Sequence, residues 1–198
     1  MTNLHCIAGS WDQIANHQAN VYGGPINSYQ AIQWYTDNGV ARHKIVMGIP
    51  LYGRSFMNTV DKPGAPFSGL GPGSWEQGVY DYRALPLPGS YVFEDKEAVA
   101  SWTYDYNKKE FISFDSESVG HSKGDWIRQE GLRGSMFWEL SGDKGTPREG
   151  MEGGEGKTEV PGQSLIKVVK DAMGPLDQSP NYLHYEGSQF ENMRKGMQ

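Results

Sequence analysis

The chain has 198 residues, of which 37% are hydrophobic, and it carries a formal net charge of −6 at pH 7 with a sequence pI of about 5.4. This length allows one domain with a core of ordinary size. The acidic balance argues against nucleic acid as a partner, because proteins that bind polyanions cluster Lys and Arg. The single cysteine, Cys6, excludes an internal disulfide. No Cys/His cluster has the spacing of a zinc site, so we expect neither a metal nor a cofactor.

The chain is rich in aromatic residues, with 6 Trp and 11 Tyr, more than a small core needs. Both side chains combine a flat apolar face with one polar group. Such a surplus suits a surface that stacks on flat apolar faces such as those of sugars. The alternative is that these residues belong to the core and to turns.

The run INSYQAIQWYTDNG is the first predicted element and is typical of an amphipathic helix. Asn27 and Ser28 are its capping candidates, and Gly39 is its stop. The next run, HKIVMGIPLYGRSF, is nearly continuously apolar over 45–49 instead of alternating. That pattern indicates a strand covered on both faces, as in parallel α/β sheets. The stretch 134–140 has the same character.

The sequence between these two strands differs from them in composition. Gly and Pro are frequent over 62–73, and four short aromatic runs follow: GVYDYRAL, GSYVFED, ASWTYDYN and EFISFDS. Their β-prone residues and intervening turn residues predict a small antiparallel insertion. A helix is expected after it, over about 122–132. The resulting order of helices and buried strands implies right-handed βα units.

Two further segments follow the second buried strand. The stretch 143–162 is dense in Gly, Glu and Lys, and we expect a solvated loop that does not pack. The run SLIKVVKDAMG places its apolar residues on one face and predicts a final helix that ends at Gly174. A parallel sheet of only two strands would leave long unpaired edges. We therefore interpret the two buried strands as part of a larger sheet.

A resemblance to a known family rests on five segments in order: AGSWDQIANHQANVYG, HKIVMGIPLYGRSF, PGSWEQGVYDYRALP, EFISFDS and LRGSMFWELSGD. Together they closely resemble the C-terminal half of a fungal endochitinase of glycoside hydrolase family 18, from about Ala8 into the tail NYLHYEGSQFENMRKGM. The resemblance implies an α/β fold, an incomplete (β/α)8 TIM barrel with an inserted α+β module. The barrel portions would be 1–55 and 121–174, the module 56–120, and the C-terminal tail 175–198.

The same resemblance implies that chitin and its oligomers are the partners, with Trp138 as the floor under the sugar at the scissile bond. The C-terminal ends of barrel strands carry the active site, and Trp138 falls at such an end. A flat aromatic ring suits the apolar face of a pyranose and could hold it while it distorts. A core tryptophan at a strand end is the alternative. Because side chains alternate along a strand, we expect Glu139 to point away and to be structural.

Four further residues are implied as substrate contacts. Tyr52 and Arg54 lie at the mouth of the other strand, where a planar guanidinium could bridge sugar hydroxyls. The alternative for Arg54 is a salt bridge to the barrel rim. Glu76, beside Trp75, would belong to the wall that the module forms, or would be a plain surface carboxylate. Trp11 would border the leaving-group side.

The family's proton donor has no counterpart here. Family 18 enzymes use the substrate's own acetamido oxygen as the nucleophile, and a glutamic acid that ends an Asp-x-x-Asp-x-Asp-x-Glu motif protonates the leaving oxygen. The 198 residues lack this motif, so we expect no catalytic residue in this chain. Glu110, Ser113, Asp115 and Glu117 imitate its spacing. Their first two positions differ from the motif and the segment matches the module, so we expect no catalytic role for them.

The sequence departs from the family again just before Ala8. His5 and Cys6 stand where the family carries a tyrosine and an aspartate that hold the acetamido group. A nucleophile and base pair is conceivable there, although adjacent residues near a terminus make a poor catalytic platform. A truncated product, or a gene model begun at the wrong start, would account for the break.

Three hypotheses follow for function: an endochitinase-class chain without its acid, a non-catalytic chitin-binding protein of lectin type, and a fragment that does not fold alone. The resemblance implies an extracellular location. The N-terminal sequence MTNLHCIAGSWD nevertheless shows no secretory signal, and no stretch reaches membrane-spanning length.

Overall fold

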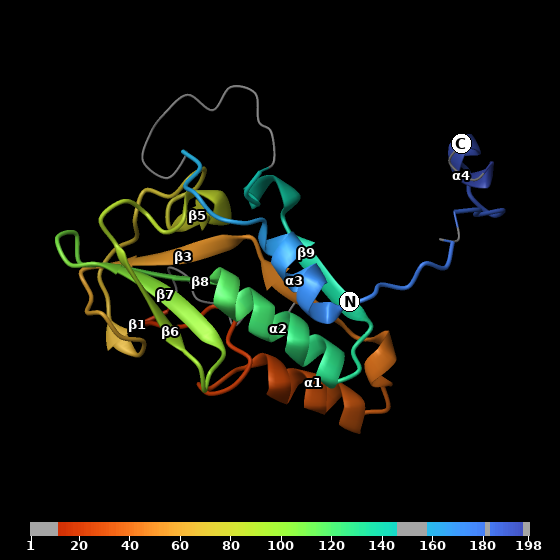
Figure 1. Cartoon of the computed structure of the whole chain (residues 1–198), viewed down its shortest axis with the longest axis horizontal. Helices are drawn as coiled ribbons and strands as arrows, with labels where there is room; N and C mark the ends of the chain where they lie inside the picture. The colour runs from red at the N-terminus through yellow and green to blue at the C-terminus, as the bar shows by residue number, and fades with distance from the viewer. Residues whose placement is uncertain (1–11, 146–157, 181–182, 196–198) are drawn as a thin grey trace.

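The computed structural model describes residues 12–145, 158–180 and 183–195. Figure 1 shows three longer helices gathered at one end of the molecule and an antiparallel sheet at the other. In chain order the helices and strands are β1 (Ile14–Ala15), α1 (Ser28–Asp37), β2 (Val46–Pro50), β3 (Tyr52–Met57), β4 (Ala65–Pro66), β5 (Val79–Asp81), β6 (Tyr91–Asp95), β7 (Ala100–Asp105), β8 (Glu110–Phe114), α2 (Glu117–Gln129), β9 (Gly134–Trp138), α3 (Leu165–Met173) and α4 (Glu191–Arg194).

Polar caps set where the three longer helices begin. The Asn27 side chain accepts the Gln30 N–H at the start of α1, as the sequence predicts. Ser164 caps α3 in the same way, and α3 ends at Met173, before the predicted stop Gly174, whose φ is +81°. α3 is not the final helix that the sequence predicted, because the short helix α4 follows in the tail. α2 begins at Glu117, earlier than the expected 122, because Ser116 is its N-cap and accepts the Val119 N–H.

β2 and β9 form a parallel two-stranded sheet in which Ile49 pairs with Phe137 and Pro50 with Trp138. β2 is buried as predicted, whereas β9 is only half-buried and its last residue is exposed. Within the described residues this pair does not close into a barrel. α2 and α3 cover the sheet and pack closely on one another, since a Cβ at Gly120 would lie 2.4 Å from Leu165 Cδ1.

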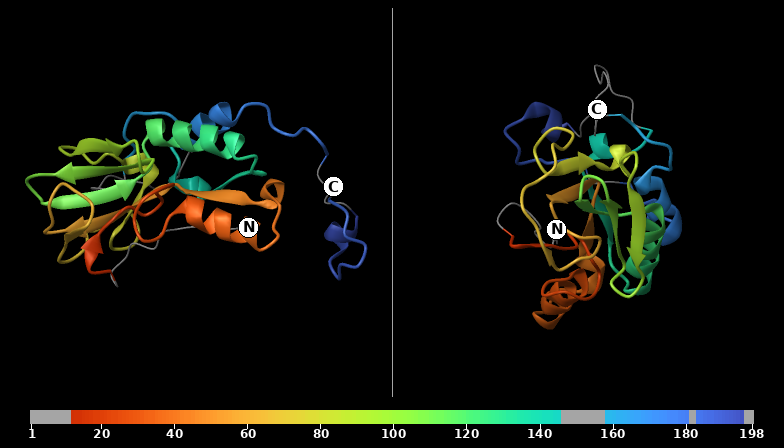
Figure 2. Two further views of the ribbon diagram at one scale, coloured as in Figure 1. Left: turned by 90° about the horizontal axis from the view of Figure 1, so that it is seen from below. Right: turned by 90° about the vertical axis from the view of Figure 1, so that its left-hand side faces the viewer.

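The region between β2 and β9 forms a five-stranded antiparallel sheet in the order β5-β3-β8-β7-β6, and it contains the four strands predicted between the buried strands. Its central region includes β3, which follows β2 after the single residue Leu51. β3 therefore runs through the expected boundary between 55 and 56, and all of it pairs with the antiparallel sheet. The two sheets meet end to end at this junction (Figure 2).

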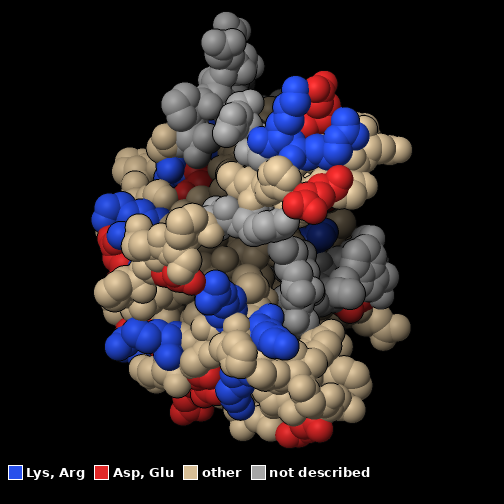
Figure 3. All heavy atoms as spheres, turned by 90° about the vertical axis from the view of Figure 1, so that its right-hand side faces the viewer, with Lys and Arg blue, Asp and Glu red and all other residues tan. Residues whose placement is uncertain are grey.

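Charged side chains of both signs lie side by side on the face drawn in Figure 3. Exposed ion pairs of the helical end, such as Arg133 with Asp177 and Lys167 with Asp171, have this mixed character. None of the described helices is long and apolar enough to cross a membrane.

One ion pair lies inside the core. The Lys123 ammonium, fully buried on α2, donates to Asp115 Oδ2 at 2.5 Å and to the Ala19 carbonyl at 2.6 Å. It thereby ties α2 to the end of β8 and to the segment that precedes α1. Burial raises the pKa of Asp115, and the neighbouring Lys123 opposes that shift.

Replacing Lys123 by Met should destabilise the fold by about 3–5 kcal/mol, because it leaves the Asp115 carboxyl buried without its cation. Urea unfolding of the chain measures the change. The double variant Lys123→Met/Asp115→Leu should recover much of the loss, and Lys167→Ala, in an exposed pair, should leave the midpoint unchanged. A Lys123→Met variant as stable as the wild type would contradict this role.

His17 is a second buried titratable residue that affects the stability of the fold. Its ring is buried beside Trp102, at 5.5 Å between centroids, and neither ring nitrogen has a hydrogen-bond partner. Burial lowers its pKa from 6.5 to about 4. The unfolded chain thus takes up a proton below about pH 6.5, whereas the folded chain does so only near pH 4.

Stability should therefore fall as the pH drops from about 6.5 to about 4, by up to about 3 kcal/mol from His17 alone, and His17 should add no further loss below that range. Unfolding free energies measured between pH 3.5 and 7.5 test this. A His17→Gln variant should show a flatter profile over the same window, and an unchanged slope would contradict the assignment.

Candidate functional site

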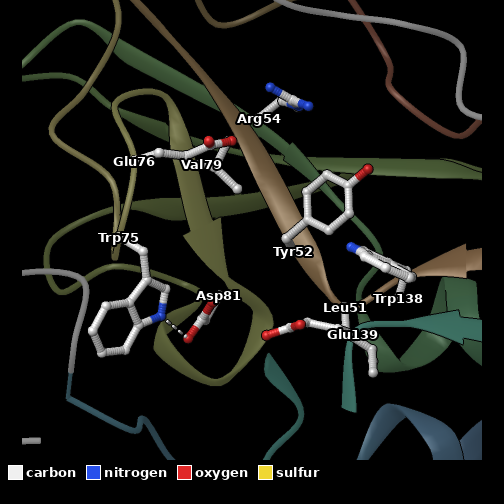
Figure 4. A pocket seen from close by; sticks show the side chains of 9 residues that line it. All are labelled: Leu51, Tyr52, Arg54, Trp75, Glu76, Val79, Asp81, Trp138 and Glu139. Carbon is white, nitrogen blue, oxygen red and sulfur yellow. Dashed lines mark hydrogen bonds between the residues drawn. The ribbon is translucent and has the colours of Figure 1, made fainter. Parts of the chain in front are cut away.

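A cavity of about 500 Å³ opens where the parallel pair meets the antiparallel sheet. The ends of β2 and β9, the start of β3 and the strand β5 surround it (Figure 4). Its lining residues are Leu51, Tyr52, Arg54, Trp75, Glu76, Val79, Asp81, Trp138 and Glu139. The site therefore depends on both sheets and on the junction between them.

The aromatic floor of the cavity is Trp138, the last residue of β9, whose side chain is 59% exposed. Its carbonyl accepts the Leu51 N–H at 2.8 Å, which holds the ends of the two parallel strands together. The peptide bond from Trp138 to Glu139 is cis. An indole this exposed at a strand end does not belong to the core, and its ring face is accessible.

Beside the floor, Tyr52 and Arg54 project from the same face of β3. The Arg54 guanidinium carbon lies 5.6 Å from the centre of the Tyr52 ring, within reach of a cation–π contact. Burial raises the pKa of the Tyr52 phenol, although Arg54 acts in the opposite direction, so the phenol stays neutral and can donate a hydrogen bond. The Gln18 side-chain amide donates to the Tyr52 carbonyl at 2.6 Å and supports the strand from behind.

The opposite wall is the tight turn between β4 and β5. Gly73 adopts φ +72°, and Ser74 N donates to the Val79 carbonyl at 2.8 Å. A Cβ at Gly73 would lie 1.9 Å from the Glu76 carbonyl oxygen, so only glycine fits there. The turn carries Trp75 and Glu76 at its tip. Figure 4 shows Trp75 across the pocket from Trp138.

The chemistry of this lining suits an uncharged, hydroxyl-rich ligand. Two indole faces and a phenol provide flat apolar surface, and Arg54 provides a planar set of donors. The carboxylates of Glu76, Asp81 and Glu139 provide acceptors. Among the described residues, no group of His, Cys, Asp and Glu is arranged to hold a metal ion.

The motif-like residues Glu110, Ser113, Asp115 and Glu117 lie outside this cavity. Glu110 is buried and accepts a hydrogen bond from the Ser55 hydroxyl at 2.6 Å, and Asp115 pairs with Lys123. Glu117 opens α2, and its carboxylate accepts the Gln163 N–H at 2.7 Å. These bonds tie the three carboxylates to neighbouring parts of the fold.

Comparison with protein families matches residues 1–143 to glycosyl hydrolases family 18. The chain belongs to this family. Chitinase 1 of Aphanocladium album is 40% identical over 197 residues, and endochitinase 1 of Metarhizium robertsii is 38% identical over the same length. Each match covers 96% of this chain and 43% of the relative. The resemblance to fungal endochitinases is thus confirmed, and the chain spans less than half the length of these relatives.

Solved structures of family 18 chitinases share the fold of this chain. Chitinase ChiA74 from Bacillus thuringiensis superposes with a TM-score of 0.71 at 28% identity, over 88% of this chain and 32% of that one. A plant class V chitinase mutant from Cycas revoluta, in complex with (GlcNAc)3, gives a TM-score of 0.68 at 22% identity, over 86% and 45% of the two chains.

The structure brings together four of the five residues expected to bind substrate. Tyr52, Arg54, Glu76 and Trp138 line one cavity of this family 18 chain, and Trp11 lies outside the described residues. His5, Cys6 and most of the 143–162 loop also lie outside them. The roles of the four clustered residues remain predictions.

Sequence reasoning missed two acidic members of the cavity. Glu139 was expected to point away from Trp138, yet it lines the same cavity, because β9 ends at Trp138 and the alternation does not extend beyond it. Asp81 gave no signal beyond its place in the run GVYDYRAL. Asp81 pairs with Tyr52 in the sheet, but this neighbour could have indicated its place at the cavity only once the pairing of β3 and β5 was known.

Replacing Gly73 by Ala should displace the turn that carries Trp75 and Glu76 and destabilise the chain by about 1–3 kcal/mol. Thermal unfolding and tryptophan fluorescence measure the two effects. Gly64→Ala is the matched control: Gly64 also has a positive φ, of +87°, but a Cβ there meets nothing within 4 Å. Equal effects of the two substitutions would show that backbone conformation, and not the close approach, decides the outcome.

Proposed function

We propose that this chain supplies the substrate-binding side of a chitin-hydrolysing site of the endochitinase type, acting on β-1,4-linked N-acetylglucosamine. The observation that carries the proposal is the gathering of Tyr52, Arg54, Glu76 and Trp138 around one cavity at the carboxyl ends of two parallel strands. Ligand sites of α/β folds occur at this end of the strands. Family membership and the chitinases among the relatives support it.

Each residue has a role that fits its chemistry. The exposed face of Trp138 would stack under the sugar at the scissile bond and hold it as it distorts toward an oxocarbenium-like geometry. Arg54 and the neutral Tyr52 would donate hydrogen bonds to sugar oxygens, and Glu76 would accept one from the opposite wall. The chitinase complexes from Cycas revoluta with (GlcNAc)3 and (GlcNAc)4 are relatives in fold that hold such oligomers.

We further propose that β2 and β9 are the last two strands of a (β/α)8 barrel and that the five-stranded sheet is the module inserted between them. The sequential order of the elements and the parallel pairing of β2 with β9 support this assignment. Such a barrel would act outside the cell, where chitin lies.

Binding without hydrolysis is the expected behaviour of these 198 residues by themselves. They contain no Asp-x-x-Asp-x-Asp-x-Glu run, and loss of a general acid removes a factor on the order of 10² to 10⁴ in rate. The same absence favours the second candidate, a chitin-binding protein of lectin type. The two differ in whether hydrolysis appears when a segment that carries this motif is supplied with the chain.

Trp138→Ala should weaken retention of the chain on chitin and its affinity for (GlcNAc)4 by at least about tenfold, the loss expected when a central aromatic anchor is removed. A pull-down and titration calorimetry measure it. Trp34→Ala is the control, because Trp34 is similarly exposed, at 61%, but lies on α1 outside the cavity.

Equal binding by Trp138→Ala and the wild type would contradict the role of the floor. Hydrolysis of a fluorogenic N-acetylglucosamine oligomer by the purified chain would contradict the expected lack of an acid, and the carboxylates of the cavity would then be the first to replace. A chain that is insoluble, or that melts without cooperativity, would favour the third hypothesis, a fragment that does not fold alone.

A further inference from the structure

The Trp75 side chain is held by a buried carboxylate although its ring faces solvent. Its indole is 61% exposed, yet its Nε1–H donates to Asp81 Oδ2 at 2.9 Å, and Asp81 is only 8% exposed (Figure 4). An exposed indole can satisfy its N–H with water, so the fold does not need this bond to avoid an unpaired donor. The bond instead selects one orientation of the ring.

The backbone around Asp81 is itself fixed by the turn that carries Trp75. Asp81 N donates to the Ser74 hydroxyl at 2.9 Å, and Ser74 N donates to the Val79 carbonyl at 2.8 Å. Asp81 also pairs with Tyr52 across the β5 and β3 strands. The carboxylate that orients Trp75 is therefore in register with the residue beside the Trp138 floor.

The orientation of the ring matters because Trp75 and Trp138 are carried by different sheets. Trp138 ends β9 of the parallel pair, and Trp75 belongs to the turn that leads into β5. Figure 4 shows the two indoles on opposite sides of the cavity, with Asp81 between them and joined to one of them. A free χ rotation at Trp75 would change the width of the cavity. When a large aromatic side chain is already immobilised, it loses less conformational entropy on binding, and the free energy of binding is more favourable.

We propose that Asp81 is a positioning residue that fixes the Trp75 indole as the wall facing Trp138, and that it thereby sets the affinity for sugar oligomers; this inference rests on the proposed function for its ligand. Asp81 acts through Trp75 and does not itself need to touch the sugar. The hydrogen-bond acceptor, and not the negative charge, is the property that matters.

Two substitutions separate these properties. Asp81→Leu removes the acceptor at similar size, and Asp81→Asn removes the charge but keeps an oxygen that can accept the indole N–H. The chain has six tryptophans, so a nitrogen–proton correlation spectrum should show six indole signals. The signal missing in Trp75→Phe identifies Trp75. This readout needs no ligand.

Asp81→Leu should shift the Trp75 indole signal and speed its hydrogen exchange, and it should weaken (GlcNAc)4 binding about two- to tenfold, as expected for loss of one hydrogen bond. Asp81→Asn should stay within about twofold of the wild type in both measurements. In the Trp75→Phe background, which lacks the donor, Asp81→Leu should cost no further affinity, because the pair acts through one bond.

Two results would overturn the proposal: an unmoved Trp75 signal in Asp81→Leu, or penalties of Asp81→Leu and Trp75→Phe that add in the double variant. If the wild-type chain binds no (GlcNAc)4, the proposed function fails, while the indole signal still reports whether Asp81 orients Trp75. If Asp81→Leu does not fold, the other two variants still test the proposal. Trp75→Phe identifies the Trp75 indole signal, and Asp81→Asn must keep that signal near its wild-type position.

Discussion

The backbone of Leu51 is the point on which the rest of this structure depends. Its N–H donates to the Trp138 carbonyl at the end of the parallel pair, and its carbonyl accepts the N–H of Tyr82, the residue that follows β5 of the antiparallel sheet. The residue is 1% exposed, and a Cβ at Gly142 would lie only 2.4 Å from its carbonyl oxygen. One buried residue thus joins two sheets of different type, and the cavity opens where they meet.

The buried polar groups that hold this arrangement differ from the polar groups that line the cavity, most of which are partly or fully exposed. Lys123 and Asp115 neutralise one another in the core and tie α2 to β8. Gln18, 2% exposed, reaches from the segment before α1 to the Tyr52 carbonyl. These bonds are made by side chains that do not line the cavity. The same distinction explains why the motif-like carboxylates of β8 and α2 lie outside the cavity.

Local elements were predictable because local forces decide them. The α1 cap at Asn27 and helix α3, which stops before Gly174, follow from side-chain capping and periodicity within a few residues. The half-burial of β9 was not predictable in this way, since it depends on what lies beside the strand. Among the site residues, Trp138, Arg54, Tyr52 and Glu76 were found through family resemblance. Asp81 was missed because its bond to Trp75 forms only when the Gly73 turn folds back.

The two exposed indoles of the cavity belong to two sheets that are joined at Leu51 and share one buried hydrophobic cluster, which includes Ile49 of β2 and Ile112 of β8. A sugar chain long enough to touch both would bind only while the sheets are docked, and it would favour that arrangement by mass action. Occupancy of the groove and the docking of the two sheets are then thermodynamically linked. A polysaccharide bound as proposed would then act as a cross-link between the two sheets as well as a ligand.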